Sequence, residues 1–118
     1  MINRERYLAI DDIRECGYCN IVARTYHDGI AALTQLGPWD CLYLDHDLGA
    51  IHQQYDDNGN ELNGYKVVCF LEENPQYQPP FVTIISSNPT GRLNIERALM
   101  AMGYEKDGNT WRKPSSSG

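Results

Sequence analysis

The sequence has 118 residues, 42% hydrophobic and 22% charged, a composition typical of globular proteins that excludes the disordered, collagen-like and disulfide-scaffold classes. Sixteen acidic against ten basic residues give a net charge of −6, which argues against a general nucleic-acid or anionic-membrane binder, because such proteins need a cationic surface. No run approaches the roughly 18 apolar residues of a membrane span, and residues 1–6 lack the apolar stretch of a signal peptide. We therefore expect a cytoplasmic protein with no membrane partner.

A single domain is expected over residues 1–113, because domains usually run to about 100–200 residues. Residues 114–118 have no periodicity and are interpreted as a frayed end or a non-native remnant. The apolar run 7–10 predicts a buried strand, and residues 20–24 predict a second one. The segment 13–19 between them is too short for a helical crossover, which needs a dozen or more residues.

A helix is predicted to begin after Thr25, because Thr25 and Asp28 have the spacing of a capping box, and to end before Gly37 and Pro38. A third strand follows over residues 40–44 and ends at Asp45. The Gly- and Asn-rich stretch that comes next predicts a long loop, and loops of this length are usually functional or mobile.

This loop covers residues 46–63, and a helix is predicted after it over residues 64–74. The apolar run 81–85 predicts another buried strand. A last helix is predicted from Asn88 and Pro89, an N-cap followed by a proline at the first helical position, and a hairpin closes the chain. Because strands and helices alternate, we expect an α/β fold, a three-layer sandwich with a mostly parallel sheet of four to five strands and a C-terminal β-hairpin.

Polar residues follow several of the predicted strands, and such strand ends form the site in open α/β sheets. They are Asp11, Asp12, Asp45, His46, Asp47, Ser86 and Ser87. Clustered carboxylates repel one another unless a cation lies between them, and hard oxygen ligands select Mg²⁺, with Mn²⁺ as an alternative, over zinc. The start of the last helix adds a candidate anion site suited to a phosphoryl group. Its residues are Asn88, Thr90, Gly91 and Arg92.

Structural interpretations stay open for several of these residues. Acidic residues commonly end strands simply because they are solvated, and His46 fits either an acid or base near neutral pH or an exposed loop histidine. Ser86 and Ser87 fit a helix cap equally well.

Four cysteines occur, and reduced thiols are expected for all of them. Cys41 and Cys69 lie in apolar runs and are interpreted as buried thiols. Cys16 and Cys19 form a C-x-x-C pair, for which thioredoxin-like chemistry or zinc binding remains an alternative.

Together these motifs resemble the cyclic-phosphate-processing receiver-like domain family, a divergent branch of the response-regulator receiver (flavodoxin-like) fold. The runs that carry the resemblance are residues 8–14, 44–49, 63–65 and 86–92. The resemblance implies Mg²⁺ held by Asp11, Asp12 and Asp45, and a phosphate-contacting hydroxyl from Ser86 or Ser87. It also implies that Asp45 accepts a phosphoryl group. The resemblance further implies that His46 and Asp47, which an ordinary receiver lacks, position a water or move a proton.

Two departures from an ordinary receiver are visible. The lysine expected after the fifth strand has no clear match except Lys106 in the hairpin, and Arg92 is a candidate to replace it. The first crossover helix is missing, which disfavours a standard two-component role. The resemblance thus implies a Mg²⁺-dependent phosphate site that hydrolyses or senses a cyclic nucleotide or a cyclic phosphate end, with a nucleotide, a phosphate ester or an RNA end as partner. The alternative is a non-catalytic binding or interaction domain, and the oligomeric state stays open.

Overall fold

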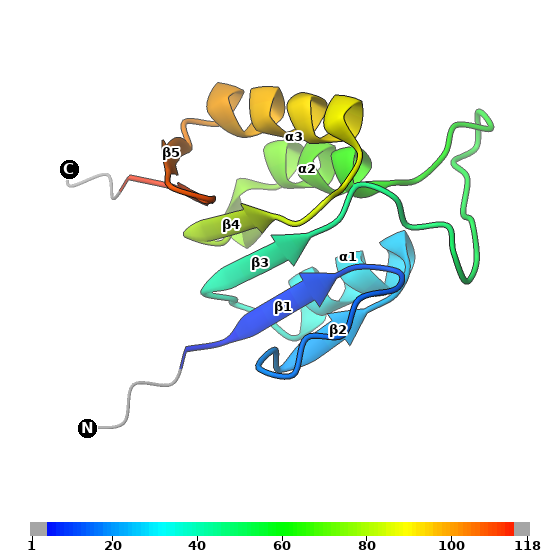
Figure 1. Ribbon diagram of the computed structural model, residues 1–118, viewed down its shortest axis with the longest axis horizontal. Helices are drawn as coiled ribbons and strands as arrows, with labels where there is room; N and C mark the ends of the chain where they lie inside the picture. The colour runs from blue at the N-terminus through cyan, green and yellow to red at the C-terminus, as the bar shows by residue number, and fades with distance from the viewer. Residues whose placement is uncertain (1–4, 115–118) are drawn as a thin grey trace.

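The computed structural model describes residues 5–114, which form three α-helices and a six-stranded sheet (Figure 1). The expected tail beyond Pro114 and the first four residues of the chain lie outside the described part. Within residues 5–114, no helix has the length and apolar character needed to cross a membrane.

The elements follow the hydrophobic runs of the sequence. In chain order they are β1 (Tyr7–Ile10), β2 (Ile21–Ala23), α1 (Tyr26–Gln35), β3 (Cys41–Leu44), α2 (Gly64–Glu73), the 3₁₀ helix η1 (Pro75–Tyr77), β4 (Phe81–Ile84), α3 (Pro89–Ala101), β5 (Glu105–Asp107) and β6 (Thr110–Arg112). The strands and α-helices predicted before residue 104 are all present, with ends displaced by about one residue. The sequence did not predict η1.

The strand order in the sheet is β2-β1-β3-β4-β6-β5. The first four strands are parallel, and β6 pairs antiparallel with both β4 and β5. The sheet therefore has six strands instead of the expected four to five, because β6 joins the edge at β4 and brings β5 with it.

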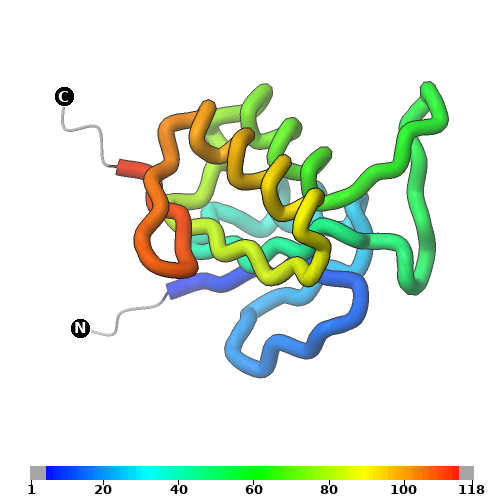
Figure 2. The backbone as a smooth tube through the Cα atoms, turned by 45° about the horizontal axis from the view of Figure 1, so that its top comes forward, coloured from blue at the N-terminus to red at the C-terminus, as the bar shows by residue number. Residues whose placement is uncertain are grey.

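The expectation of three layers is wrong, because the helices share one face of the sheet. The crossovers from β2 to β3 and from β3 to β4 step in the same direction, so right-handed connections place α1 and α2 on the same side. Helix α2 contacts both α1 and α3, and Figure 2 shows α2 in green running beside α3 in yellow and orange. Within the described residues the fold has two layers, and no helix covers the opposite face of the sheet.

Burial along the strands follows this arrangement. Leu8 and Ile10 of β1 and their neighbours Leu42 and Leu44 of β3 are fully buried against the helices. Tyr43, which lies between the last two in sequence, points to the opposite face and is only half-buried. Side chains alternate between the faces of a strand, so this pattern marks one face as core and the other as open.

Each helix begins at the residue that the sequence pattern indicates. The side chains of Thr25, Asn63 and Asn88 each accept a hydrogen bond from a backbone N–H in the first turn of α1, α2 and α3. Such caps satisfy N–H groups that would otherwise lack a partner. The predicted starts at Thr25 and at Asn88 are therefore confirmed.

The loop between β1 and β2 holds a disulfide between Cys16 and Cys19, so the expectation of reduced thiols is wrong for this pair. A turn closed by the Cys19 N–H donating to the Cys16 carbonyl places the two Cα atoms 5.4 Å apart, within bonding range. Cys41 and Cys69 are free thiols; the first is buried, as expected, and the second only half-buried.

Candidate functional site

Three aspartates meet where β1 and β3 end. Asp11 and Asp12 follow β1, and Asp45 follows β3, whose last residue Leu44 lies beside Ile10. The Asp45 N–H donates to the Ile10 carbonyl at 2.9 Å, which extends the parallel pairing by one step. One carboxylate oxygen from each aspartate lies within 4.8 Å of the others, although the residues are only 1%, 4% and 6% exposed. The three expected metal-binding residues thus lie together.

Backbone N–H groups fix the orientation of these carboxylates. The donors are Ile13 and Arg14 to Asp11 Oδ1 (3.0 and 2.9 Å), Ala50 to Asp12 Oδ2 (2.8 Å) and His46 to Asp45 Oδ1 (2.8 Å). The second oxygen of Asp12, Oδ1, is buried without a hydrogen-bond partner among the described residues. A buried polar atom without a partner is costly, and a cation beside it removes that cost.

The electrostatics of the cluster favour an added positive charge. The pKa of Asp45 is raised to about 6, first by burial and then by the negative charge of Asp11, and the nearby Arg14 opposes this shift. A divalent cation among three carboxylates would reverse it, and an all-oxygen donor set fits Mg²⁺ or Mn²⁺. The orphaned Asp12 Oδ1 and this donor set together make the cluster fit such an ion.

Arg14 provides a positive charge at the cluster itself. Its Nη1 lies 3.2 Å from Asp11 Oδ2 and 3.3 Å from Asp45 Oδ2, so one guanidinium bridges two buried carboxylates. Arg14 had no predicted role. Its position three residues after Asp11 was the available signal, because the turn that follows β1 folds the side chain back over the strand ends.

A cavity of about 320 Å³ opens at the cluster. Its lining residues are Asp12, Ile13, Arg14, Asp45, Asp47 and Ser87. The structure separates the two serines that the sequence left equivalent: Ser87 lines the cavity, whereas Ser86 Oγ accepts a hydrogen bond from the Asn88 N–H at 3.0 Å and supports the start of α3.

His46 and Asp47 form a linked pair beside this cavity. His46 Nδ1 lies 2.9 Å from Asp47 Oδ1, which the Asn88 side chain also contacts at 3.4 Å. The His46 ring packs against the first turn of α3, where a Cβ on Gly91 would lie only 2.3 Å from it. His46 therefore reaches the cavity through Asp47. The hydrogen bond from His46 is the main cause that lowers the pKa of Asp47.

The chain was compared with models of known protein families to find the family to which it belongs. Residues 6–101 match the model of the cyclic-phosphate processing receiver domain. The chain belongs to this family. No curated protein and no solved structure matches it.

The basic residues of this receiver domain are placed differently from an ordinary receiver. Lys106 Nζ lies 3.9 Å from Glu96 of α3. Arg92 donates to the Ile84 carbonyl at 3.1 Å, and its Nε also lies 3.9 Å from Glu96. The carboxylates of the aspartate cluster are contacted by the guanidinium of Arg14, whereas Arg24 donates to the backbone carbonyl of Asp11.

Polar side chains at the start of α3 form hydrogen bonds with the backbone of the helix start itself. Asn88 Oδ1 accepts the hydrogen bond from the Gly91 N–H at 3.0 Å. Gly91 is buried against His46, and Thr90 is exposed. Glycine is therefore required at position 91 because a Cβ there would collide with the His46 ring. The sequence had suggested another reason, the close approach of a phosphate to the backbone.

Replacing Gly91 with alanine is expected to displace the His46 ring and to lower the free energy of unfolding by about 1–3 kcal/mol, as overpacking usually does. Thermal denaturation and the NMR signals of the His46 ring measure the two effects. Gly17→Ala is the matched control, because a methyl group added at Gly17 would have no atom within 4 Å of it. Equal stability of the two variants would contradict the packing of His46 on Gly91.

Proposed function

We propose that the cavity at the strand ends binds Mg²⁺ and the phosphate of a cyclic nucleotide or a cyclic phosphate end, and that it hydrolyses the cyclic ester. The observation that carries this proposal is the group of three buried carboxylates with the unpartnered Asp12 Oδ1 among them. Membership in the cyclic-phosphate processing receiver family supports the substrate class.

The proposed division of roles follows from the contacts. Asp11, Asp12 and Asp45 hold the ion, which supplies Lewis-acid polarisation and charge neutralisation when bound. Asp45 attacks phosphorus, the ring P–O bond breaks, and the leaving oxygen takes up a proton from solvent, which the later loss of a proton from the attacking water returns. Water then attacks the resulting acyl phosphate, which releases the opened monoester and restores the Asp45 carboxylate.

Asp47 and His46 are proposed to handle the protons of these steps. The lowered pKa keeps Asp47 ionised near neutral pH, so it can orient the attacking water. Asp47 takes up the proton that the water loses and releases it to solvent, while His46, hydrogen-bonded to Asp47 through Nδ1, holds that carboxylate in place. Because its ring is packed on Gly91, His46 acts as a positioning residue as well.

The phosphate is proposed to contact Ser87 and Arg14, the hydroxyl and the guanidinium that line the cavity. Ser86, Asn88 and Gly91 support them by fixing the start of α3, whereas the exposed Thr90 is the remaining candidate in its first turn. Arg92 interacts with the Ile84 carbonyl and with Glu96. We therefore assign it a less direct contact with the phosphate than the sequence suggested.

The test is turnover of 2′,3′-cyclic nucleotides, 3′,5′-cyclic nucleotides and RNA ends carrying a cyclic phosphate, with Mg²⁺, with Mn²⁺ and with chelator. Metal-dependent release of the opened monoester is expected for one class. We expect turnover to disappear in Asp45→Asn, because the amide is a poor nucleophile and the substitution also removes one of the three carboxylates that would hold the ion.

A second control separates hydrolysis from binding alone. Saturable stabilisation by a cyclic nucleotide with no turnover on any of these substrates would identify a phosphate sensor and overturn the hydrolytic proposal. Neither turnover nor stabilisation would leave an interaction domain with a receiver fold.

A further inference from the structure

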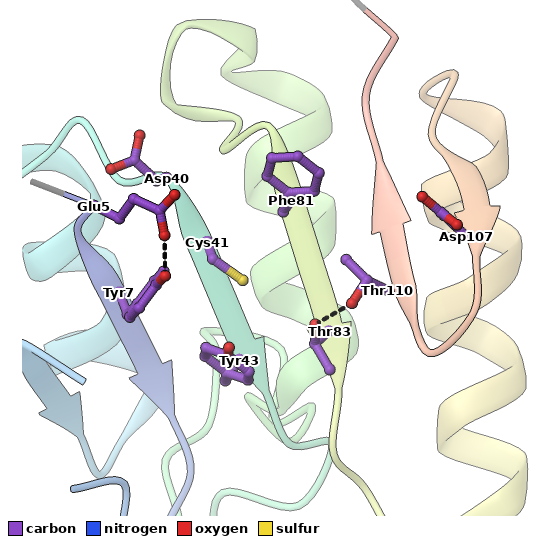
Figure 3. A pocket seen from close by; sticks show the side chains of 9 residues that line it. All are labelled: Glu5, Tyr7, Asp40, Cys41, Tyr43, Phe81, Thr83, Asp107 and Thr110. Atoms are coloured by element: carbon purple, nitrogen blue, oxygen red, sulfur yellow. Dashed lines mark hydrogen bonds between the residues drawn. The ribbon is translucent and has the colours of Figure 1, made fainter. Parts of the chain in front are cut away.

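We propose that the sheet face opposite the helices carries a second binding site, which takes a small organic cation of the alkylammonium class. This site lies apart from the acidic cavity at the strand ends, and it does not depend on the proposed hydrolysis. Its basis is a pocket of about 490 Å³ (Figure 3), which is within the size range of ligand sites. The lining residues are Glu5, Tyr7, Asp40, Cys41, Tyr43, Phe81, Thr83, Asp107 and Thr110.

The strand register makes this pocket a slot between aromatic walls. Tyr7 of β1, Cys41 of β3 and Phe81 of β4 lie in one row across the sheet. The short side chain of Cys41 leaves a gap between the rings of Tyr7 and Phe81. The backbones of these two residues are two strand spacings apart, or roughly 10 Å. This is enough for one small ligand between the rings, and the view into the slot shows Cys41 between them (Figure 3).

The floor of the slot is neutral and polar. Thr83 and Thr110, which are register partners, share a hydrogen bond of 3.0 Å between their hydroxyls. Burial raises the pKa of the Cys41 thiol and of the Tyr43 hydroxyl, so both stay uncharged at neutral pH. The aromatic wall at Tyr7 is reinforced by an edge-to-face contact between Tyr7 and Tyr43 at 6.1 Å.

The charges around the slot are negative. Glu5, Asp40 and Asp107 line it, and no lysine, arginine or histidine of the described chain does. Asp40 is fixed by the backbone N–H of Arg6 at 2.6 Å, and Glu5 accepts the hydrogen bond of the Tyr7 hydroxyl. Figure 3 shows Glu5 and Asp40 at one end of the slot and Asp107 at the other.

The one arginine next to Phe81 in the strand register is already engaged. Arg112 pairs with Phe81 across β4 and β6, and its Nη2 is 3.9 Å from Glu105. Among the described residues that line the slot, Asp40 and Asp107 are acidic and none is basic. Aromatic faces attract cations through their quadrupoles, and carboxylates add to this attraction, so the slot is complementary to an alkylammonium ion.

The probe is choline, with its uncharged isostere 3,3-dimethylbutan-1-ol as the matched control. Both are titrated into ¹⁵N-labelled protein with saturating Mg²⁺, so that the acidic cavity is already occupied. We expect choline to shift amides of β1, β3 and β4 with a Kd of about 1 mM, and the isostere to bind at least about tenfold more weakly.

Two substitutions test the walls and the charge. Phe81→Leu keeps an apolar side chain but removes the ring, and it is expected to weaken choline binding about threefold to tenfold. Asp107→Asn removes one exposed charge and is expected to weaken it about twofold. Glu72→Gln, on the exposed surface of α2, is the matched charge control and should change nothing.

Three results would overturn this proposal. Equal affinity for choline and its isostere would show an apolar slot without cation selectivity. No saturable shift up to about 50 mM choline, well above the expected Kd, would exclude the site. Shifts of the same amides with protein concentration alone would show that a second copy of the chain covers this face.

Discussion

Replacing Asp45 with asparagine is expected to stabilise the metal-free protein at pH 7 and to remove its thermal response to Mg²⁺. Asp45 is buried beside Asp11, and its pKa is raised from 3.8 to about 6. Holding this carboxylate ionised costs roughly 3 kcal/mol by that difference. The amide also loses the contact with Arg14, so the expected net gain is about 1–3 kcal/mol, or roughly 4–12 °C in Tm.

The same shift predicts a pH dependence for the metal-free wild type. Between pH 4 and pH 6 the folded protein keeps a proton on Asp45 that the unfolded chain has lost. The stability contributed by protonated Asp45 is therefore complete below pH 3.8 and is lost as the pH rises through about 6. Asp45→Asn should flatten this part of the profile.

The measurement is Tm across pH 4–8, with chelator and with Mg²⁺, for wild type and Asp45→Asn. An ion that binds only the folded state raises the free energy of unfolding by about 1.4 kcal/mol at ten times its Kd, and Tm rises with it. Wild type should gain this and the variant should not. Asp57→Asn is the control, because Asp57 lies exposed in the long loop. A Mg²⁺ response that survives in Asp45→Asn would contradict the metal site.

The aspartate cluster was predictable because the local sequence pattern places each aspartate at a strand end, and the parallel topology brings those strand ends together. Short apolar runs that end at Asp11 and Asp45 predict buried strands, and parallel strands bring such ends to one edge. Thr25 and Asn88 cap helices by contacts within four residues, which sequence patterns encode well. For these features, the nearest neighbours along the chain determine the structure.

What the sequence did not predict depends on contacts distant along the chain. The two-layer architecture follows from the direction of successive crossovers, which no single segment encodes. The choice between Ser86 and Ser87 depends on which one supports the backbone of α3. Likewise Gly91 resembled a phosphate-binding glycine until the position of the His46 ring was known.

Removing the Arg14 side chain is expected to strengthen Mg²⁺ binding and to weaken phosphate binding. Its guanidinium contacts Asp11 Oδ2 and Asp45 Oδ2, and these two aspartates are among the three that would hold a metal ion. Arg14 and Mg²⁺ therefore compete. Removing Arg14 is expected to tighten Mg²⁺ binding by about tenfold, which corresponds to about 1.4 kcal/mol of relieved competition.

The metal-free Arg14→Ala variant should be less stable than wild type at pH 7, because Asp45 loses the charge that lowers its pKa. In the presence of Mg²⁺, phosphate contact should weaken instead, since the displaced guanidinium is the one proposed to face the phosphoryl oxygens across the cavity. Metal affinity and phosphate affinity should thus change in opposite directions on one substitution.

Calorimetric titration with Mg²⁺, followed by inorganic phosphate at saturating metal, measures both affinities on the same sample. Arg14→Lys is the matched variant: it keeps the charge but cannot bridge two carboxylates in the planar geometry of a guanidinium, so both affinities should lie between those of wild type and alanine. Weaker Mg²⁺ binding in Arg14→Ala would show that Arg14 supports the ion instead of occupying its place. Unchanged phosphate binding would assign the guanidinium to the metal-free cluster alone.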